Sequence, residues 1–417
     1  MPSLINIKEL FTPNISNNLV SKTRGDRVIW GIVVILTLIS LLVVYSSTGS
    51  LAYKYSKSTE SYLFKQFAFI ILGLFVIYFA HRVNYTIYAR VAKILFLISI
   101  PLMIYTLLFG SKINSASRWI TLPVINMTLQ TSDLAKLALF MYLSLQLSRK
   151  QAVIKDFKKG FLPIVIPVVI ICAVIAPANL STALLVAATS FMLMFIGRVR
   201  TKHILVSMGI AMIPVIFLLI VAISTYDKNA RKSNELPAIL DMGRVKTWVS
   251  RIQTFIYSSK DDDTEKSYQI NQAKIAIANG GWLGKGPGNS EARNFLPHSY
   301  SDFIYAIIIE EYGLFGAAFM IFIYLLFLHR CIRLYRKCPF AFGAFLALAL
   351  SFTLVIQAIA NMGVAVNAFP NTGVTLPLVS MGGSSFLFTC LAIGIILSVA
   401  RNVEQLEGKH QPVVVNE

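Results

Sequence analysis

The segment Asn279–Glu311, NGGWLGKGPGNSEARNFLPHSYSDFIYAIIIEE, joins a long polar stretch of the chain to an apolar one. It concentrates glycines, basic residues and aromatics, and it enters the apolar run at a single acid, Asp302. Two more acids, Glu310 and Glu311, lie inside that run. Carboxylates below a membrane surface are costly unless they are paired or solvated, so they are candidates for function. The segment therefore predicts a functional site where a polar loop meets a membrane helix.

The composition of the whole chain is that of a polytopic membrane protein. Of its 417 residues, 56% are hydrophobic and only 14% are charged, which excludes an ordinary soluble domain. The formal net charge of +19 does not require nucleic acid as a partner, because basic residues gather in the cytoplasmic loops of membrane proteins. The four cysteines lie in or beside apolar runs and form no disulfide or metal-binding pattern.

Ten apolar runs are candidates to cross about 30 Å of hydrocarbon, and every second loop between them is rich in Lys and Arg. The positive-inside rule then places both termini in the cytoplasm. We therefore expect an all-α, polytopic fold of about ten transmembrane helices with one large external loop. The runs are Val28–Ser46, Leu63–Ala80, Val91–Phe109, Ser132–Leu147, Phe161–Ala176, Leu180–Gly197, Ile204–Ser224, Phe303–Leu328, Phe340–Asn361 and Gly383–Ala400.

These runs divide the chain into three parts. We expect a cytoplasmic tail at residues 1–27, a transmembrane domain at residues 28–401 and a second cytoplasmic tail at residues 402–417. The large external loop covers residues 225–301 of the transmembrane domain.

Two helices are expected within the external loop. The segment Arg244–Tyr257 places apolar side chains on one helical face and basic ones, including Arg251, on the other. Such a helix suits a membrane surface, with its basic face toward lipid phosphates. The alternative is that its apolar face packs on the outer rim of the protein itself. Residues Tyr268–Ala278 predict a second helix, which stops at Gly280.

Asp302 is the candidate catalytic residue. A carboxylate at the junction of an external loop and a membrane helix is partly desolvated, which suits it to act as a general base. The alternative is that Asp302 only caps the following helix, since Asp is favoured at that position. Glu310 follows eight residues later, about 80° round an ideal helix. We therefore expect Glu310 in the same cavity as Asp302, and Glu311 on nearly the opposite side.

Several cationic residues are candidates for binding an anionic group. Lys136 follows Asp133 by three residues, so the two side chains can share a helical face; snorkelling to the membrane surface is the alternative. Arg118 is either an interfacial anchor or an anion contact. Lys285 lies in a glycine-rich stretch, residues 281–288, whose backbone amides and cation suit a phosphate.

A second unusual segment, Thr372–Ser385 (TGVTLPLVSMGGSS), joins the last two apolar runs. Pro, Gly and Ser at membrane depth are tolerated where the backbone lines a cavity or packs on protein. Ser384 is the substrate-binding candidate in this segment. The sequence contains no zinc ligand set, no Walker loop and no nucleophile elbow.

These motifs, in this order on about ten helices, resemble those of the SEDS family (shape, elongation, division and sporulation) of peptidoglycan polymerases. Asp302 falls on the position of that family's essential loop aspartate. Gly288–Ser290 and Thr375 resemble the FtsW-like branch of the family more than the RodA-like branch. The motifs are LPHSYSDFIYAIIIEEYG (Leu296–Gly313), NMGVAVNAFPNTGVTLPLVSMGGSS (Asn361–Ser385), SASRWI (Ser115–Ile120), TSDLAKL (Thr131–Leu137) and NLSTAL (Asn179–Leu184).

Three residues depart from the family pattern. His298 stands where the family has a glutamate, Tyr300 where it has a histidine, and Asp133 where it has a glutamate. None of these changes removes Asp302, but they alter the side chains around it.

The resemblance implies a glycosyltransferase that polymerises lipid II into glycan strands at the outer face of the bacterial cytoplasmic membrane during cell division. Asp302 would accept the proton of the attacking sugar hydroxyl in a single, inverting displacement. The leaving group, undecaprenyl diphosphate, needs positive charge, which basic side chains or a divalent cation such as Mg²⁺ would provide; no other cofactor and no metal site of the protein itself is expected. The expected substrate-binding residues are Lys136, Arg118, Lys285, Glu310, Arg251 and Ser384.

The resemblance also implies partners: a class B penicillin-binding protein, which is a single-pass transpeptidase, and other divisome proteins. Two functions from other classes stay open. A flippase for the lipid-linked precursor would use Lys136, Glu310 and Glu311 as a polar pathway through the membrane. A non-catalytic scaffold at the division site would use the external loop to dock a periplasmic enzyme.

Overall fold

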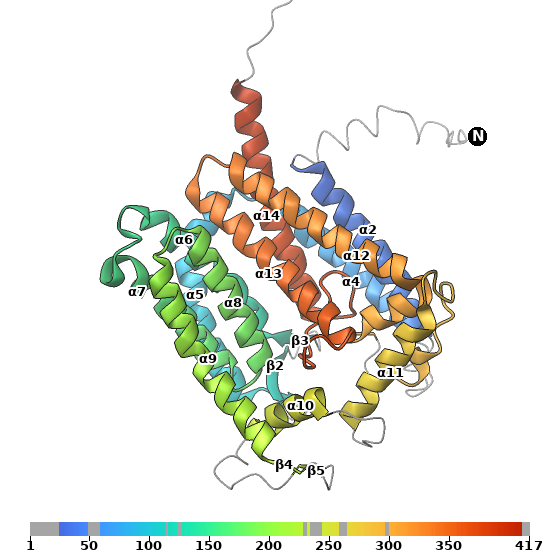
Figure 1. Cartoon of the computed structure of the whole chain (residues 1–417). Helices are drawn as coiled ribbons and strands as arrows, with labels where there is room; N and C mark the ends of the chain where they lie inside the picture. The colour runs from blue at the N-terminus through green and yellow to red at the C-terminus, as the bar shows by residue number, and fades with distance from the viewer. Residues whose placement is uncertain are drawn as a thin grey trace, which may run out of the picture.

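The computed structural model describes residues 25–48, 59–113, 116–122, 127–227, 232–233, 244–257, 265–296 and 300–410. Within these residues, long helices run side by side as one bundle (Figure 1). In chain order they are α2 (Arg27–Ser47), α4 (Thr59–Arg82), α5 (Tyr85–Phe109), α6 (Thr131–Arg149), α7 (Leu162–Ile175), α8 (Leu180–Ile196), α9 (Thr201–Ser224), α12 (Ile304–Lys337), α13 (Ala341–Ala365) and α14 (Gly383–His410).

The bundle confirms the predicted helical, polytopic architecture, because each of the ten apolar runs coincides with one of these helices. Eight of them are long and apolar enough to span a membrane, with the π-helical turn η3 (Phe157–Phe161) extending α7. Of the other two, α8 is a shorter apolar helix and α6 carries more polar residues. The number of ten spans therefore stays a prediction.

The centre of the bundle is formed by α13 and α14. In the most apolar stretch of each helix, 83% of α13 and 72% of α14 is buried, against 11% of α9, which lies at the periphery. Small residues let the central helices approach closely. A Cβ atom added to Gly73 of α4 would lie 2.6 Å from Cys390 Sγ of α14, and one added to Gly394 of α14 would lie 2.6 Å from Ala80 of α4.

Short elements gather at one end of the bundle, the lower end in Figure 1. Strands β1 (Ser111–Ile113), β2 (Ala116–Leu122) and β3 (Met127–Gln130) form an antiparallel sheet in that order. The pair β4 (Tyr226–Asp227) and β5 (Lys232–Ser233) lies near α10 (Val245–Tyr257) and α11 (Glu265–Gly280). The strands are an addition to the helical prediction: they are too short for their alternation to stand out in the sequence.

The amphipathic helix α10 lies within the predicted segment, and its apolar face packs on the protein. Val249 is 1% exposed against Leu218, Val221 and Ala222 of α9. Gln253 Nε2 donates to the Ala222 carbonyl at 3.0 Å. The outer-rim alternative is therefore the one that the structure shows for Val249, while Ile256 of the same face is 43% exposed.

The opposite end of the bundle brings the start of α2 and the end of α14 together (Figure 1). The backbone amide of Gly25 donates to Glu404 Oε2 at 2.6 Å, and Asp26 pairs with Arg330 at 3.7 Å. The two ends of the helical region thus lie on one side of the bundle. Their placement in the cytoplasm and the domain boundaries stay predictions.

Candidate functional site

Asp302 lies in a turn directly before α12, at the end of the bundle that carries α10 and the small sheet. Its side chain is partly exposed, and Ser301 Oγ donates to its Oδ1 at 3.2 Å. The N-cap residue of α12 is Phe303, which makes no side-chain capping bond. The alternative in which Asp302 only caps the helix is therefore not what the structure shows.

Arginine side chains from two distant segments surround Asp302. A Cβ atom added to Gly373 would lie 3.6 Å from Asp302 Oδ2 and 3.9 Å from Arg251 Nη2, so the carboxylate and the guanidinium of α10 both border this glycine. Arg251 Nη1 donates to the Asn371 carbonyl at 3.0 Å. Arg118 of β2 donates through Nε to the Ala178 carbonyl at 2.8 Å.

A third guanidinium, that of Arg244, donates to the same Ala178 carbonyl as Arg118. Burial, with the nearby charges of Arg244 and Arg251, lowers the pKa of Arg118 to about 9, while Asp302 opposes this shift. Burial also lowers the pKa of Arg244 and of Arg251, and Asp302 again opposes the shift of Arg251. Three half-buried cations therefore lie close together, and two of them, Arg118 and Arg251, are in the field of the Asp302 carboxylate. This excess of positive charge suits a multiply charged anion.

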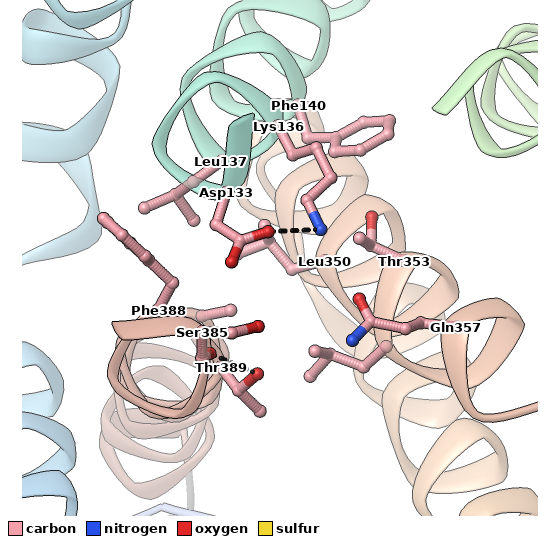
Figure 2. Close-up of a pocket in the computed structure, with 12 residues that line it drawn as sticks. Asp133, Lys136, Leu137, Phe140, Leu350, Thr353, Gln357, Ser385, Phe388 and Thr389 are labelled. Atoms are coloured by element: carbon pink, nitrogen blue, oxygen red, sulfur yellow. Dashed lines mark hydrogen bonds and ion pairs between the residues drawn. The ribbon is translucent and has the colours of Figure 1, made fainter. Parts of the chain in front are cut away.

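Lys136 of α6 points into a cavity between α6, α13 and α14 (Figure 2). Its Nζ lies 2.7 Å from Asp133 Oδ1, and the two side chains are only 14% and 5% exposed. The prediction that both share a helical face is confirmed, and the lysine does not snorkel. Figure 2 shows its amine in a cavity with Thr353 and Gln357 of α13 on one side.

The Lys136 cavity is connected to the surroundings of Asp302 through α13. A second cavity beside Lys136 is lined by Gln357 and by Val374, the neighbour of Gly373. Asn361, one helical turn from Gln357, donates through Nδ2 to Val374 O at 2.7 Å and to Asp302 O at 3.0 Å. The lysine, the carboxylate and the arginines thus belong to one region of the bundle.

Glu310 and Lys285 lie elsewhere, in contrast to the predicted site. Glu310 is fully buried and accepts hydrogen bonds from Ser290 Oγ and from the amides of Glu291 and Ala292, both at 3.2 Å. Lys285 Nζ lies 3.6 Å from Glu310 and 3.2 Å from Glu291. The helical angle between Asp302 and Glu310 failed as a guide because α12 begins after Asp302, so the two do not belong to one continuous helix.

The glycine-rich loop forms backbone hydrogen bonds across a break in α12. Gly313 has φ 67° and ψ −165°, which interrupts the helix. The amides of Lys285 and Gly286 donate to Glu310 O and Glu311 O, both at 2.9 Å. The amides of Leu314 and Phe315 donate to the carbonyls of residues 281 and 282 at 3.0 and 3.4 Å. The amides of residues 285 and 286 are therefore already paired and do not form the predicted phosphate cradle.

Glu311 is bound by the same loop and by α2. Ser46 of α2 donates to its Oε1, and Arg293 Nη1 donates to the carbonyl and hydroxyl oxygens of Ser46, both at 3.3 Å. The two adjacent glutamates thus anchor the loop of residues 281–296 to α12 and α2.

Ser384 is buried, and its Oγ accepts a hydrogen bond from the amide of Gln130 at 3.0 Å, which ties the end of β3 to α14. Its neighbour Ser385 lines the Lys136 cavity instead. Sequence reasoning overlooked Ser385, Gln357 and Asn361. The signal for the latter two was present, because polar side chains one turn apart inside an apolar run are costly without a role.

The three residues that depart from the family pattern, Asp133, His298 and Tyr300, differ in what the structure shows of them. Asp133 takes part in the ion pair with Lys136, and His298 lies outside the described residues. Tyr300 accepts a hydrogen bond through its carbonyl from Met381. Among the residues that the structure describes, no group of three or more His, Cys, Asp or Glu side chains could hold a metal ion.

Comparisons with known proteins agree with this arrangement. Two curated relatives bear the name probable peptidoglycan glycosyltransferase FtsW. That of Trichlorobacter lovleyi is 32% identical, covering 91% of this chain and 94% of its own. That of Geobacter metallireducens is 31% identical, covering 94% and 98%.

Solved structures share the fold. The rod shape determining protein RodA of Thermus thermophilus aligns with a TM-score of 0.61 at 21% identity, covering 91% of this chain and 97% of its own. A chain of a structure entitled "Structural coordination of polymerization and crosslinking by a peptidoglycan synthase complex" aligns with a TM-score of 0.68 at 23% identity, covering 91% and 99%. The family model described as cell cycle protein, for FtsW, RodA and SpoVE, matches residues 26–405. The chain therefore belongs to the FtsW, RodA and SpoVE family, the SEDS family that its motifs resemble, and its relatives are of the FtsW type.

Proposed function

We propose that this bacterial multi-pass membrane protein is a peptidoglycan glycosyltransferase that polymerises lipid II during cell division. Its FtsW relatives carry the name of that activity. The observation that carries the proposal is the meeting of Asp302 with Arg251 beside Gly373, with Arg118 in the same field and Arg244 near both arginines. In this proposal Asp302 is the proton acceptor and the arginines bind the charged leaving group.

The reaction that fits this arrangement is a single displacement at an anomeric carbon. A sugar hydroxyl attacks that carbon, and its proton passes to the Asp302 carboxylate. The bond from the carbon to the diphosphate oxygen breaks, and the electron pair leaves with undecaprenyl diphosphate. One displacement inverts the anomeric centre and needs no covalent intermediate on the protein.

Positive charge on the chain stabilises the developing diphosphate. Arg118 and Arg251 are each held by a carbonyl oxygen of the protein, and in this proposal their charges stabilise the anion. Lys136 provides a further cation in the neighbouring cavity, held by Asp133. A divalent cation such as Mg²⁺ would depend on Asp302 and on substrate phosphates, since Mg²⁺ is commonly held by one or two carboxylates with phosphates and water.

The remaining proposals concern partners and orientation. A class B penicillin-binding protein is the expected transpeptidase partner, together with other divisome proteins. The solved chain entitled as part of a peptidoglycan synthase complex supports an assembly of this kind. The end of the bundle with Asp302, α10 and the sheet faces outward in this proposal, with both termini in the cytoplasm.

The flippase alternative has less support than the sequence suggested. It relied on Glu310 and Glu311 as parts of a polar pathway, yet both carboxylates are engaged by the loop of residues 281–296. The scaffold alternative does not account for two half-buried guanidinium groups held in the field of a carboxylate. One experiment distinguishes the polymerase from both alternatives.

The test uses purified full-length protein in nanodiscs with its transpeptidase partner, and lipid II as substrate. Asp302→Asn is expected to abolish glycan formation, because the amide cannot accept the hydroxyl proton. Glu291→Gln is the matched control, since it neutralises an exposed carboxylate of the preceding loop. Equal polymerisation by Asp302→Asn and parent would refute the proposal. Transfer of lipid II across proteoliposomes without glycan formation would favour the flippase.

A further inference from the structure

The segment Val374–Met381, which we call the re-entrant segment, returns into the bundle without forming a helix. Its residues are buried among the helices: Leu376 is 1% exposed, Val379 0% and Ser380 2%. Leu378 has φ 63°, a conformation that L-residues rarely adopt. Non-helical backbone at membrane depth is tolerated only where it is covered by protein or lines a cavity.

Polar side chains from several helices meet the carbonyl groups of the re-entrant segment. Ser40 Oγ of α2 donates to Val379 O at 2.8 Å, and the phenol of Tyr324 of α12 donates to Pro377 O at 2.6 Å. Gln357 Nε2 of α13 donates to Thr375 O at 3.0 Å. Because an unpaired carbonyl in this environment costs several kcal/mol, these bonds fix the segment firmly in place.

The fixed segment in turn holds the backbone around Asp302. The amide of Met381 donates to Tyr300 O at 3.1 Å, and Ser380 Oγ donates to Ser301 O at 2.7 Å. Asn361 Nδ2 donates to Asp302 O at 3.0 Å. Three consecutive carbonyl groups, at residues 300, 301 and 302, are thus bound by donors from one neighbouring region.

We propose that Ser380 and Asn361 are positioning residues for Asp302, acting through the backbone of residues 300–302. Asp302 precedes α12 and lacks that helix's own hydrogen-bond ladder, so its place depends on these external donors. Asn361 also binds Val374 O, so one amide links the re-entrant segment to the catalytic candidate. This inference rests on the proposed role of Asp302 as general base.

The test compares kcat and KM for lipid II between parent, Ser380→Ala and Asn361→Leu in nanodiscs. A displacement of about 1 Å at a reacting group can cost about 10²-fold in rate. We therefore expect kcat to fall about ten- to a hundred-fold, with KM within about twofold of the parent because a general base acts in the chemical step. Ser380→Thr keeps the hydroxyl and is expected to retain the parent rate.

The matched control is Ser190→Ala. Ser190 of α8 is also a buried serine, and its Oγ donates to a carbonyl of its own helix, that of Val186 at 2.7 Å. Its loss is expected to leave kcat unchanged. A thermal melt of each variant checks that it folds. If Ser380→Ala does not fold, Ser380→Cys replaces it, since a thiol keeps the volume and weakens the donor.

The decisive comparison adds Ser380→Ala to Asp302→Ala. If Ser380 acts through Asp302, the double variant is expected to have the same residual rate as Asp302→Ala alone. An equal fold-loss in both backgrounds would overturn the inference and leave the proposed function intact, as would a parent-like kcat for Ser380→Ala and Asn361→Leu. Full activity of Asp302→Ala would overturn the proposed function, and this inference with it.

Discussion

Replacement of Gly313 by alanine tests how the break in α12 is built. The break places Gly313 at φ 67° and ψ −165°, a region that only glycine occupies readily. A Cβ atom added there would lie 2.3 Å from Trp282 O and 2.6 Å from the Gly284 amide. Both neighbours are backbone atoms, so the loop itself has to move.

The magnitude follows from two contributions. Holding alanine in this conformation costs about 1–3 kcal/mol. Moving the loop disturbs the hydrogen bonds that cross the break, among them Lys285 N to Glu310 O and Leu314 N to Gly281 O, at 2.9 and 3.0 Å. Losing two such bonds adds about 1–3 kcal/mol, so the total destabilisation is about 2–6 kcal/mol.

The assay is thermal unfolding of parent and variant in the same detergent, with Gly31→Ala as the matched control. Gly31 lies in α2, and a Cβ atom added there meets nothing within 4 Å. Alanine at that position is expected to stabilise by a few tenths of a kcal/mol up to about 1 kcal/mol, because glycine is a poor helix former. Unfolding of Gly313→Ala at the temperature of the parent would show that the backbone contacts described here do not constrain the loop.

Three further outcomes are expected. Gly373→Ala adds a Cβ in ordinary contact with Asp302 Oδ2 at 3.6 Å but forces alanine to φ 65°. Glycan synthesis should therefore fall, while the melting temperature should drop by less than for Gly313→Ala. An unchanged rate of glycan synthesis would contradict this prediction. Lys136→Met leaves Asp133 buried without its cation and should cost about 3–5 kcal/mol of stability, whereas combining it with Asp133→Leu should restore the melting temperature but not activity in the lipid II assay. The pKa of Arg118 is lowered from 12.5 to about 9, so below pH 9 the side chain is charged and its buried charge destabilises the folded state. Both this destabilisation and the affinity for pyrophosphate should decrease as the pH rises through 9. Titration calorimetry of Arg118→Gln with pyrophosphate should show no such transition.

Local patterns in the sequence predicted most of the helical framework. Hydrophobicity over about twenty residues is sufficient to identify a candidate membrane helix, and each of the ten apolar runs coincides with a helix. The 3.6-residue period likewise identified α10, since Val249 and its neighbours lie on one face. The pair of Lys136 and Asp133 followed from a spacing of three residues within one helix.

Predictions that extended beyond one element were less successful. The angle between Asp302 and Glu310 assumed a continuous helix, but α12 starts at Ile304. Lys285 was expected at the catalytic site because it lies in a glycine-rich loop, yet its charge is paired with two glutamates. Composition shows that a group is charged but does not show which partner it finds.

The sequence by itself determined the membrane-spanning class, the helices and the position of one acid at the start of an apolar run, because these depend on side chains close together in the chain. Only the tertiary structure decided that Arg118, Arg251 and Asp302 share one site, and that the backbone of residues 300–302 is bound by Ser380 and Asn361. Those contacts join segments far apart in the chain, and their geometry follows from how the helices pack and where each one begins.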